Sequence, residues 1–284
     1  MAEQQKIREF IVQALAEDIG DGDQTSLACI AEQATGHAAL LAKEEGIIAG
    51  VELASQIFDV VDSGLHCSLL MVDGERIFPG DRILTVSGKA RSILKAERLV
   101  LNCMQRMSGI ATMTRRYADA IEGTDATLLD TRKTTPGFRH FEKWAVRIGG
   151  GHNHRFGLYD MMMIKDNHID YAGSVVKALE AARHYLAHTG KRLKIEVEAR
   201  TMEEVEEILQ SGGADRIMLD NFKPDMLARA VIRIGNLCET EASGNITLTN
   251  IRDYALTGVK YISVGALTHS YRSLDLSLKA SIHP

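Results

Sequence analysis

The chain has 284 residues, of which 45% are hydrophobic and 25% charged, a composition typical of a globular protein with one large domain or two smaller ones. Its formal net charge of -5 argues against a broadly basic nucleic-acid-binding protein, and only 5% of its residues are aromatic. No apolar run approaches the roughly 18 residues of a membrane-spanning helix, so we expect no membrane insertion.

Four cysteines, Cys29, Cys67, Cys103 and Cys238, are scattered along the chain and form no Cys-x-x-Cys pair. The first residues, MAEQQKIREF, are polar and contain no apolar core of a secretory signal. Both features predict a cytoplasmic protein with reduced thiols.

The N-terminal part of the chain predicts a small α+β module. Apolar residues at helical spacing indicate an amphipathic helix over 1–19, and short strand-like runs separated by turns follow over 37–88, with a helix at 51–61. A long helical pattern covers 91–121, and we expect Ser108-Gly109 to interrupt it. The module over 37–88 carries no motif that points to chemistry.

After residue 126, short apolar strands alternate with helices. The predicted strands are TLLD (127–130), MMMIK (161–165), LKIEVE (193–198), RIMLD (216–220), LCETE (237–241) and YISVG (261–265). The later strand ends at Glu198, Asp220, Glu241 and Val264 are 22, 21 and 23 residues apart, which leaves room for one strand, one helix and two loops each. The sequence therefore predicts parallel β/α units.

Five of these strands end in a charged residue: Asp130, Lys165, Glu198, Asp220 and Glu241. In a β/α barrel, the carboxyl ends of the strands converge on the active site. Packing alone does not explain one charge at the same end of each apolar strand. We therefore predict an enzyme whose site lies at these ends.

The segment 131–165 is basic although the whole chain is acidic. It holds seven cations against two acids, Glu142 and Asp160; the cations are Arg132, Lys133, Arg139, Lys143, Arg147, Arg155 and Lys165. A charge run is often a solvated loop, but here Gly and apolar residues divide it as in a pocket wall. We therefore predict a pocket for a small polyanion.

Two groups in this region have competing interpretations. Lys165 could form a Schiff base, as in barrel aldolases, or act as a permanent cation that clamps an anion, which we favour because other cations are near. His152 and His154, with His168 as a third ligand, could bind zinc, but a His-x-His pair in a Gly-rich loop is weak support.

Glu198 and Asp220 suit sugar hydroxyls, a hydrated Mg²⁺ or a developing positive charge, and the alternative is that they only pair with the basic segment. Small residues follow the last two strands, at 243–245 and 264–266. Loops at this place in a barrel bind phosphate through backbone N–H groups.

Several motifs together give the chain a likeness that covers nearly its whole length. They are AERLVLNCMQRMSGIAT (96–112), DTRKTTPGFR (130–139), GGGHNHRFGL (149–158), IKDNH (164–168), EVE (196–198), LDNF (219–222), EASGNI (241–246) and SVGALTHS (263–270). With these motifs the chain resembles the quinolinate phosphoribosyltransferase family, also called nicotinate-nucleotide pyrophosphorylase (carboxylating). The resemblance implies an α/β protein: an N-terminal open α/β sandwich domain, 1–112, with 273–284 packing back on it, then an incomplete (β/α) TIM-like barrel, 113–272.

The resemblance also implies the activity. The family converts quinolinate and phosphoribosyl pyrophosphate to nicotinate mononucleotide, pyrophosphate and CO₂ in NAD biosynthesis, with Mg²⁺. It implies a homodimer with shared active sites, or a higher oligomer of dimers, and no nucleic-acid or membrane partner.

Carried over by motif, the expected catalytic residues are Lys133, Lys165, Glu198 and Asp220, of which Glu198 and Asp220 face the ribose and Mg²⁺. The expected substrate-binding residues are these four with Arg106, Thr131, Arg132, His154, Arg155, Ser243, Gly244, Asn245, Val264, Gly265, Ala266 and His269. The matching arginine of the family reaches the partner subunit's quinolinate, so Arg106 is expected to act in trans. Asn245 stands where the family usually has Gly, and since Asn tolerates left-handed backbone angles we expect the loop to survive.

Three rival hypotheses remain at this point. The same barrel could carry a Schiff-base aldolase or a phosphosugar isomerase, or a phosphoribosyltransferase that acts on a different acidic heterocycle. A module that binds anions or RNA through 131–165 is the non-enzymatic alternative, and the acidic chain and few aromatic residues disfavour it.

Overall fold

The computed structural model describes residues 2–281, which form two compact units. The first unit holds the residues up to Met113 and those from Tyr271 on, and the second holds Thr114–Ser270. The sequence placed these boundaries at 112 and 273. Residues 282–284 of the predicted C-terminal segment lie outside the described residues. Within the described part, no helix combines the length and the apolar character that crossing a membrane requires.

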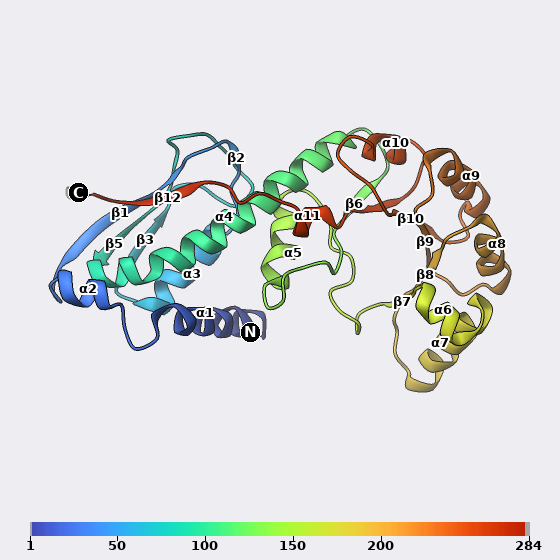
Figure 1. Cartoon of the computed structure of the whole chain (residues 1–284), viewed down its shortest axis with the longest axis horizontal. Coiled ribbons are helices and arrows are strands. Elements are labelled where there is room, and N and C mark those ends of the chain that lie inside the picture. The colour runs from blue at the N-terminus through green and yellow to red at the C-terminus, as the bar shows by residue number, and fades with distance from the viewer. Residues whose placement is uncertain (1, 282–284) are drawn as a thin grey trace. The chain divides into compact units, whose positions relative to one another are not determined.

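An antiparallel sheet in the order β12-β1-β5-β3 is the centre of the first unit (Figure 1). Its strands are β1 (Thr35–Ala42), β3 (His66–Leu69), β5 (Arg82–Lys89) and β12 (Leu276–Ser281), and a small second sheet pairs β2 (Gly46–Ile47) with β4 (Arg76–Ile77). Burial alternates along the second half of β1, so that Leu40 and Ala42 face the core. The helices are α1 (Ala2–Ile19), α2 (Gln24–Cys29), α3 (Val51–Val61) and α4 (Ala90–Ala120), which continues into the second unit.

The predicted interruption of the long helix is wrong, because α4 is continuous over 31 residues. Ser108 and Gly109 let other segments approach the helix instead of breaking it. The Ser108 hydroxyl accepts from the backbone N–H of Ala49 at 2.9 Å and lies 3.2 Å from its carbonyl oxygen. A Cβ at Gly109 would lie 2.3 Å from the carbonyl oxygen of Arg272, so only Gly fits there.

The second unit is a six-stranded parallel sheet in the order β6-β11-β10-β9-β8-β7. Its strands are β6 (Thr127–Leu129), β7 (Met162–Ile164), β8 (Ile195–Ala199), β9 (Arg216–Asp220), β10 (Glu239–Ser243) and β11 (Tyr261–Ser263). β6 and β7 are the two ends of this order and do not pair with each other. The sheet is therefore a barrel left open between its first and second strands, as the family resemblance implied.

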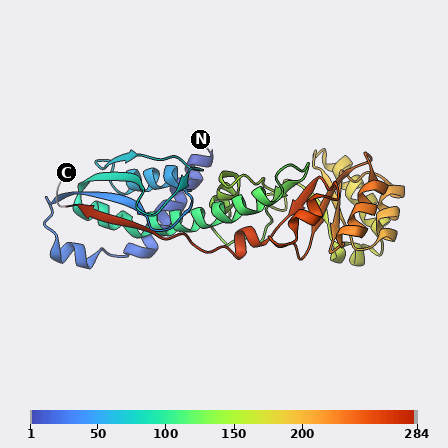
Figure 2. The ribbon, with the colours of Figure 1, turned by 90° about the horizontal axis from the view of Figure 1, so that it is seen from above.

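Helices follow the strands of this unit and cover the outer side of its sheet, as α7, α8 and α9 show in Figures 1 and 2. They are α5 (Arg139–Ile148), α6 (Asp166–Ala172), α7 (Val175–Thr189), α8 (Met202–Ser211), α9 (Pro224–Ile234), α10 (Ile251–Ala255) and α11 (Ala266–His269). Ser174 and Thr201 cap α7 and α8 by accepting backbone N–H groups, and Pro224 begins α9.

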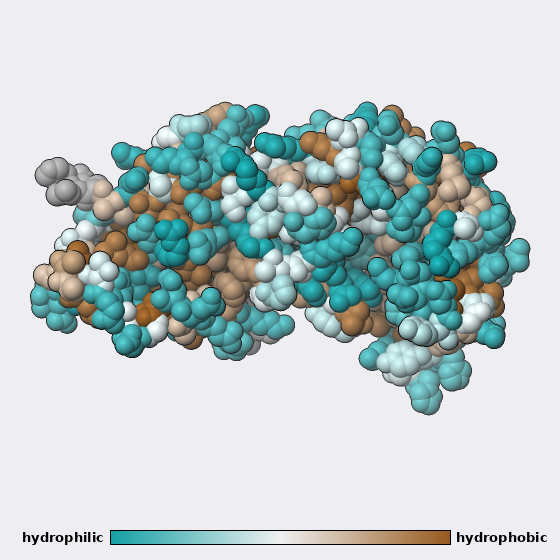
Figure 3. Space-filling view, viewed as in Figure 1, coloured by the Kyte–Doolittle hydropathy of each residue, from teal (hydrophilic) through white to brown (hydrophobic). Residues whose placement is uncertain are grey.

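The surface is mixed in character, and hydrophilic residues cover most of the face shown in Figure 3. All four cysteines are free thiols, in agreement with the sequence prediction.

Candidate active site

A pocket of about 780 Å³ lies at the carboxyl ends of the parallel strands. Strand geometry explains its lining, because every second residue of a strand faces the same side of the sheet. In β9, Met218 and Asp220 line the pocket, and Ser243 and Ser263 do so at the ends of β10 and β11. The inner face of the open barrel is thus the pocket wall.

All but one of the sequence-predicted site residues line this pocket. They are Thr131, Arg132, Lys133, His154, Arg155, Lys165, Glu198, Asp220, Ser243, Gly244, Asn245, Val264, Gly265, Ala266 and His269. Arg106 is the exception, since it lies on α4 in the first unit, with its guanidinium 5.2 Å from the ring of Tyr271. Its predicted role in a partner's site stays a prediction.

Four cations of the basic segment, Arg132, Lys133, Arg155 and Lys165, line the pocket, and in the described part of the chain none of them forms a salt bridge. The Nε of Arg132 is buried without a hydrogen-bond partner. Burial, together with the charge of Arg132, lowers the pKa of Arg155. Four cations gathered in one pocket without a salt bridge form a site that an anion would stabilise.

The other three cations of the segment do not line the pocket, so the prediction of one basic cluster is wrong in extent. Arg139 donates to Thr134 and to the carbonyl of Phe156, and Arg147 donates to Asn153. Lys143 is fully buried and pairs with Asp130. Sequence counts alone do not separate cations that hold loops from cations that face a cavity.

Two of the five charged strand ends also lie elsewhere than predicted. Asp130 is completely buried, where it accepts from Lys143, from Asn153 at 2.6 Å and from the backbone N–H of His154 at 2.8 Å. It therefore fastens the loop that carries His154 instead of facing a ligand. Glu241 is not a strand end, because β10 continues to Ser243, so Glu241 lies one layer below the pocket.

Glu198 and Asp220 face the pocket from neighbouring strands. Burial and the charge of Asp220 raise the pKa of Glu198, and Lys165 opposes this shift. Burial likewise raises the pKa of Asp220, against a hydrogen bond from Asn221 and the charge of Lys165. Two partly buried carboxylates whose ionised forms are disfavoured are suited to meet a cation or a developing positive charge.

The loops after β10 and β11 have backbone shapes that need small residues. Gly244 has φ 93°, and a Cβ there would lie 2.3 Å from Oδ1 of Asn221. Asn245 has φ 54°, so the expectation that Asn adopts a left-handed angle here is confirmed. Its side-chain amide donates to Asn221 Oδ1 at 2.9 Å, and Asn221 in turn donates to Asp220 at 2.6 Å. The loop is thereby tied to the carboxylate of Asp220.

Comparison with known proteins gives the family. The family model described as quinolinate phosphoribosyl transferase, C-terminal domain, matches residues 110–279, and the model for the N-terminal domain matches 23–108. The chain belongs to the quinolinate phosphoribosyltransferase family.

Individual relatives agree with this assignment over nearly the whole chain. Quinolinate phosphoribosyltransferase [decarboxylating] 1b of Nicotiana tabacum is 49% identical over 96% of this chain and 82% of its own length. The chloroplastic nicotinate-nucleotide pyrophosphorylase [carboxylating] of Arabidopsis thaliana is 48% identical over the same shares. The crystal structure of NadC from Streptococcus pyogenes superposes with a TM-score of 0.92 at 39% identity, covering 97% of this chain and 96% of that chain.

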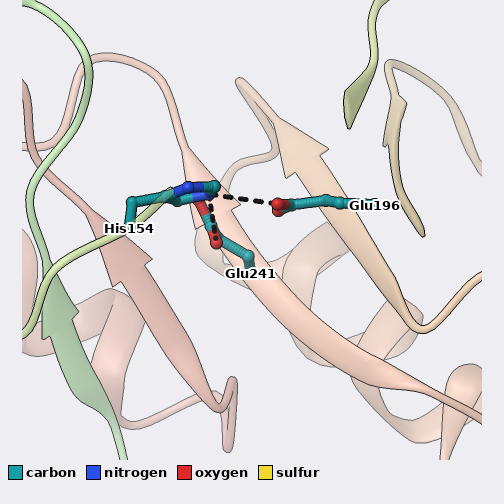
Figure 4. A group of neighbouring side chains, drawn as sticks. All are labelled: His154, Glu196 and Glu241. Carbon is teal, nitrogen blue, oxygen red and sulfur yellow. Dashed lines mark ion pairs between the residues drawn. The ribbon is translucent and has the colours of Figure 1, made fainter. Parts of the chain in front are cut away.

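The sequence did not single out Glu196 as a functional residue, and the structure groups it with His154 and Glu241. The Nε2 of His154 lies 3.0 Å from Glu196 and 3.3 Å from Glu241, and all three side chains are buried (Figure 4). Glu196 lies two residues before Glu198 on the same face of β8, and this alternation was the available signal.

The His-x-His zinc alternative does not match this arrangement. His152 is exposed and pairs through its backbone with Leu129, and His168 Nδ1 accepts from the backbone N–H of Lys165. Among the described residues, the group with metal-ligand geometry is instead His154, Glu196 and Glu241.

Proposed function

We propose that this chain transfers the phosphoribosyl group of phosphoribosyl pyrophosphate to the ring nitrogen of quinolinate and releases pyrophosphate and CO₂. The product is nicotinate mononucleotide, a precursor of NAD. The observation that carries the proposal is a pocket lined by four cations, none of them in a salt bridge within the described residues, and by the carboxylates of Glu198 and Asp220, in a chain that belongs to this family.

Charge balance supports the choice of substrates. Quinolinate is a dicarboxylate and the donor is a pyrophosphate ester, so several negative charges enter one pocket. Arg132, Lys133, Arg155 and Lys165 can meet these charges, and two of the four are guanidinium groups, which bind carboxylates in a bidentate manner. We assign the 5′-phosphate to the loops 243–245 and 264–266, with His269 beside Gly265.

The carboxylates support the transfer step. When pyrophosphate leaves, positive charge develops on the ribose, and fixed carboxylates at Glu198 and Asp220 stabilise that charge without reorganising. The electron pair of the ring nitrogen then forms the new bond to the ribose, and the ring becomes a pyridinium. No side chain has to act as a general base, because the ring nitrogen carries no proton.

The decarboxylation follows from the same charge. The bond between the ring and the neighbouring carboxylate breaks, CO₂ departs, and the electron pair stays on the ring carbon beside the positive nitrogen. That carbon then takes up a proton. Lys165 acts here as a permanent cation and forms no Schiff base, so borohydride added with substrate is expected to leave the mass of the protein unchanged.

Mg²⁺ is the proposed cofactor, and the residues present fit it. Oxygen ligands are what Mg²⁺ prefers, and it usually keeps several waters and binds one or two carboxylates together with substrate phosphates. Glu198 and Asp220 would hold it in this way, and burial already raises the pKa of both, so that a nearby cation stabilises their ionised forms. When bound, the ion neutralises charge on the departing pyrophosphate.

The test is to incubate the protein with quinolinate, phosphoribosyl pyrophosphate and Mg²⁺ and to detect nicotinate mononucleotide by mass spectrometry. Nicotinate, which lacks the second carboxylate, is the matched control and is expected to give little product. EDTA is expected to abolish turnover and added Mg²⁺ to restore it. Absence of the nucleotide, or a borohydride-trapped adduct at Lys165, would reject the proposal in favour of another activity.

We also propose a homodimer in which Arg106 of each subunit completes the site of its partner. Its support is the family resemblance of the segment 96–112 together with the position of Arg106 outside the lining of its own pocket. A two-fold interface is reciprocal, so each chain would give one arginine and receive one. The cytoplasmic location remains a prediction.

A further inference from the structure

A buried polar column lies directly under the pocket floor and has no role in the function proposed so far. His154 is at its top, Glu196 and Glu241 lie beneath, and Arg216 follows with its Nη1 2.9 Å from Glu241 and its Nη2 3.2 Å from Glu239. Neither oxygen of Glu196 has another hydrogen-bond partner in the described part of the chain. Burying this many charges is costly even when they pair with one another, so a role for them beyond stability is worth seeking.

The two carboxylates fix the imidazole of His154. Carboxylate oxygens only accept, so the ring proton they share is on Nε2 (Figure 4). Burial by itself would lower the pKa of His154, but the close carboxylates of Glu196 and Glu241 outweigh it and raise the pKa to about 9. The opposite ring nitrogen, Nδ1, lies 2.6 Å from the backbone N–H of Arg155, which points at it. Both ring nitrogens are therefore occupied by protein groups.

This arrangement does not favour a metal ion, although the three ligand atoms lie within 4.8 Å of one another. A histidine that binds metal through Nε2 carries its proton on Nδ1 and donates it to an acceptor. Here the backbone N–H of Arg155 faces Nδ1, and it is a donor. Arg216 moreover already occupies one oxygen of Glu241, and its positive charge would repel the ion.

We propose that Glu196 and Glu241 are positioning residues that act through His154 on Arg155. The imidazole is held from below at Nε2 and holds the backbone of Arg155 at Nδ1. The guanidinium of Arg155, whose own anchor is the carbonyl of Met161 at 3.2 Å, is thereby set in the pocket beside Arg132. Asp130 holds the same loop from the other side, through the backbone N–H of His154.

The inference rests on the proposed function, since it assigns Arg155 to an anionic substrate, but its test measures binding and not turnover. Binding of quinolinate and of phosphoribosyl pyrophosphate is measured separately by calorimetry. Arg155→Ala first identifies the substrate that depends on this arginine. Glu196→Leu is then expected to lower the affinity for the same substrate by about 10-fold, because small displacements of a binding group are that costly. The affinity for the other substrate is expected to stay within about 2-fold of the wild-type value.

A double-mutant cycle gives the decisive comparison. In the Arg155→Ala background, Glu196→Leu is expected to cause no further loss, because its effect passes through Arg155. Glu196→Gln keeps an acceptor for Nε2 and is expected to retain most of the affinity. Glu206→Gln removes a carboxylate from an exposed ion pair with Arg233, outside the polar column, and is the control with unchanged affinity for both substrates. If Glu196→Leu does not fold, Glu196→Ala, which adds no bulk, replaces it in the same cycle.

Three results would overturn the inference. One is an additive loss in the double variant, and another is an equal loss for both substrates, which a general structural defect would cause. The third is a stoichiometric metal ion in the purified protein that Glu196→Leu removes. A wild-type protein that binds both substrates but makes no nicotinate mononucleotide would reject the proposed function and leave this comparison valid.

Discussion

At the scale of single residues, the two pocket carboxylates combine a functional role with a cost in stability. Glu198 and Asp220 have raised pKa values, so the folded state binds their protons more tightly than the unfolded state does. Each therefore destabilises the fold as the pH rises through the unfolded and then the folded pKa, and that cost is fully present at neutral pH. Sites shaped for catalysis often show this opposition between stability and activity.

Replacing one of them with its amide should separate the two effects. Glu198→Gln is expected to raise the melting temperature of the ligand-free protein at pH 7.5, measured by calorimetry, and the gain should shrink toward pH 4, where the wild-type carboxyl becomes protonated. Turnover should fall by about 100-fold, because a fixed charge that stabilises the transition state is lost. A lower melting temperature at pH 7.5 would contradict the pKa direction.

The left-handed backbone of Asn245 gives a second prediction at this scale. Asn245→Ala keeps a Cβ at φ 54° and loses the hydrogen bond to Asn221, so we expect a loss of about 1–2 kcal/mol in the free energy of unfolding. Asn245→Gly loses the same bond but relieves the backbone, and its loss should stay under about 1 kcal/mol. Both variants should lower the apparent affinity for the phosphoribosyl donor more than that for quinolinate. Denaturant titration and steady-state kinetics of the two variants make the comparison.

At the scale of elements, helix α4 shows how a residue pattern can be misinterpreted. Gly109 lies against the carbonyl of Arg272, where a Cβ would clash with backbone atoms that cannot move independently. Gly109→Ala is therefore expected to destabilise the protein by about 1–3 kcal/mol, the usual cost of overpacking, although Ala favours helix more than Gly does. Lys95→Ala, on an exposed position of the same helix, is the control and should change the stability by less than about 0.5 kcal/mol. An unchanged melting temperature in Gly109→Ala would mean that the two segments separate readily.

The strands and helices of the barrel were predictable because their signals are local. Apolar runs at regular spacing indicated the parallel strands, and the 21 to 23 residues between strand ends left room for one helix each. The sequence did not predict whether a side chain near the end of a strand reaches the pocket or lies in the layer below it. Glu241 was expected at the pocket, yet β10 extends two residues further, and one layer of the barrel is two residues.

The residues of the candidate site were predictable where a family motif contains them. They were less predictable where burial decides whether a charged side chain faces the pocket or pairs inside the protein. Lys143 and Lys165 are both cations of the same segment, but only the fold shows that Asp130 neutralises the first while the second lines the pocket. Glu196 was missed for the same reason. Its carboxylate has meaning only beside His154, and the two lie on segments 42 residues apart in sequence.

At the scale of the whole molecule, the proposed sharing of the site between two subunits can be tested by complementation. Arg106→Ala and Lys165→Ala chains are each expected to be nearly inactive alone. When they are co-expressed, each mixed dimer should contain one site with both groups intact and one site with neither. With random pairing, about half of the dimers are mixed, so roughly a quarter of wild-type activity should return.

The control for this experiment is a proof that mixed dimers form, by pulling down two different affinity tags in sequence. If Arg106 served the pocket of its own chain, every site would lack one group and no activity would return. Recovery of about a quarter, on the other hand, requires that the arginine and the lysine come from different chains.

The pairing of β12 with β1 has a consequence for the order in which the protein is made. β12 begins at Leu276, whereas β1, with which it pairs, and β5 on the other side of β1 are complete by Lys89. A ribosome that adds about 5–20 residues per second needs roughly 10–40 s to cover the distance between them. During that time β1 is an open edge strand, with a row of unpaired backbone groups that another nascent chain could join. The first unit is therefore the first to emerge and the last to close, and chaperone demand during synthesis should concentrate on this edge.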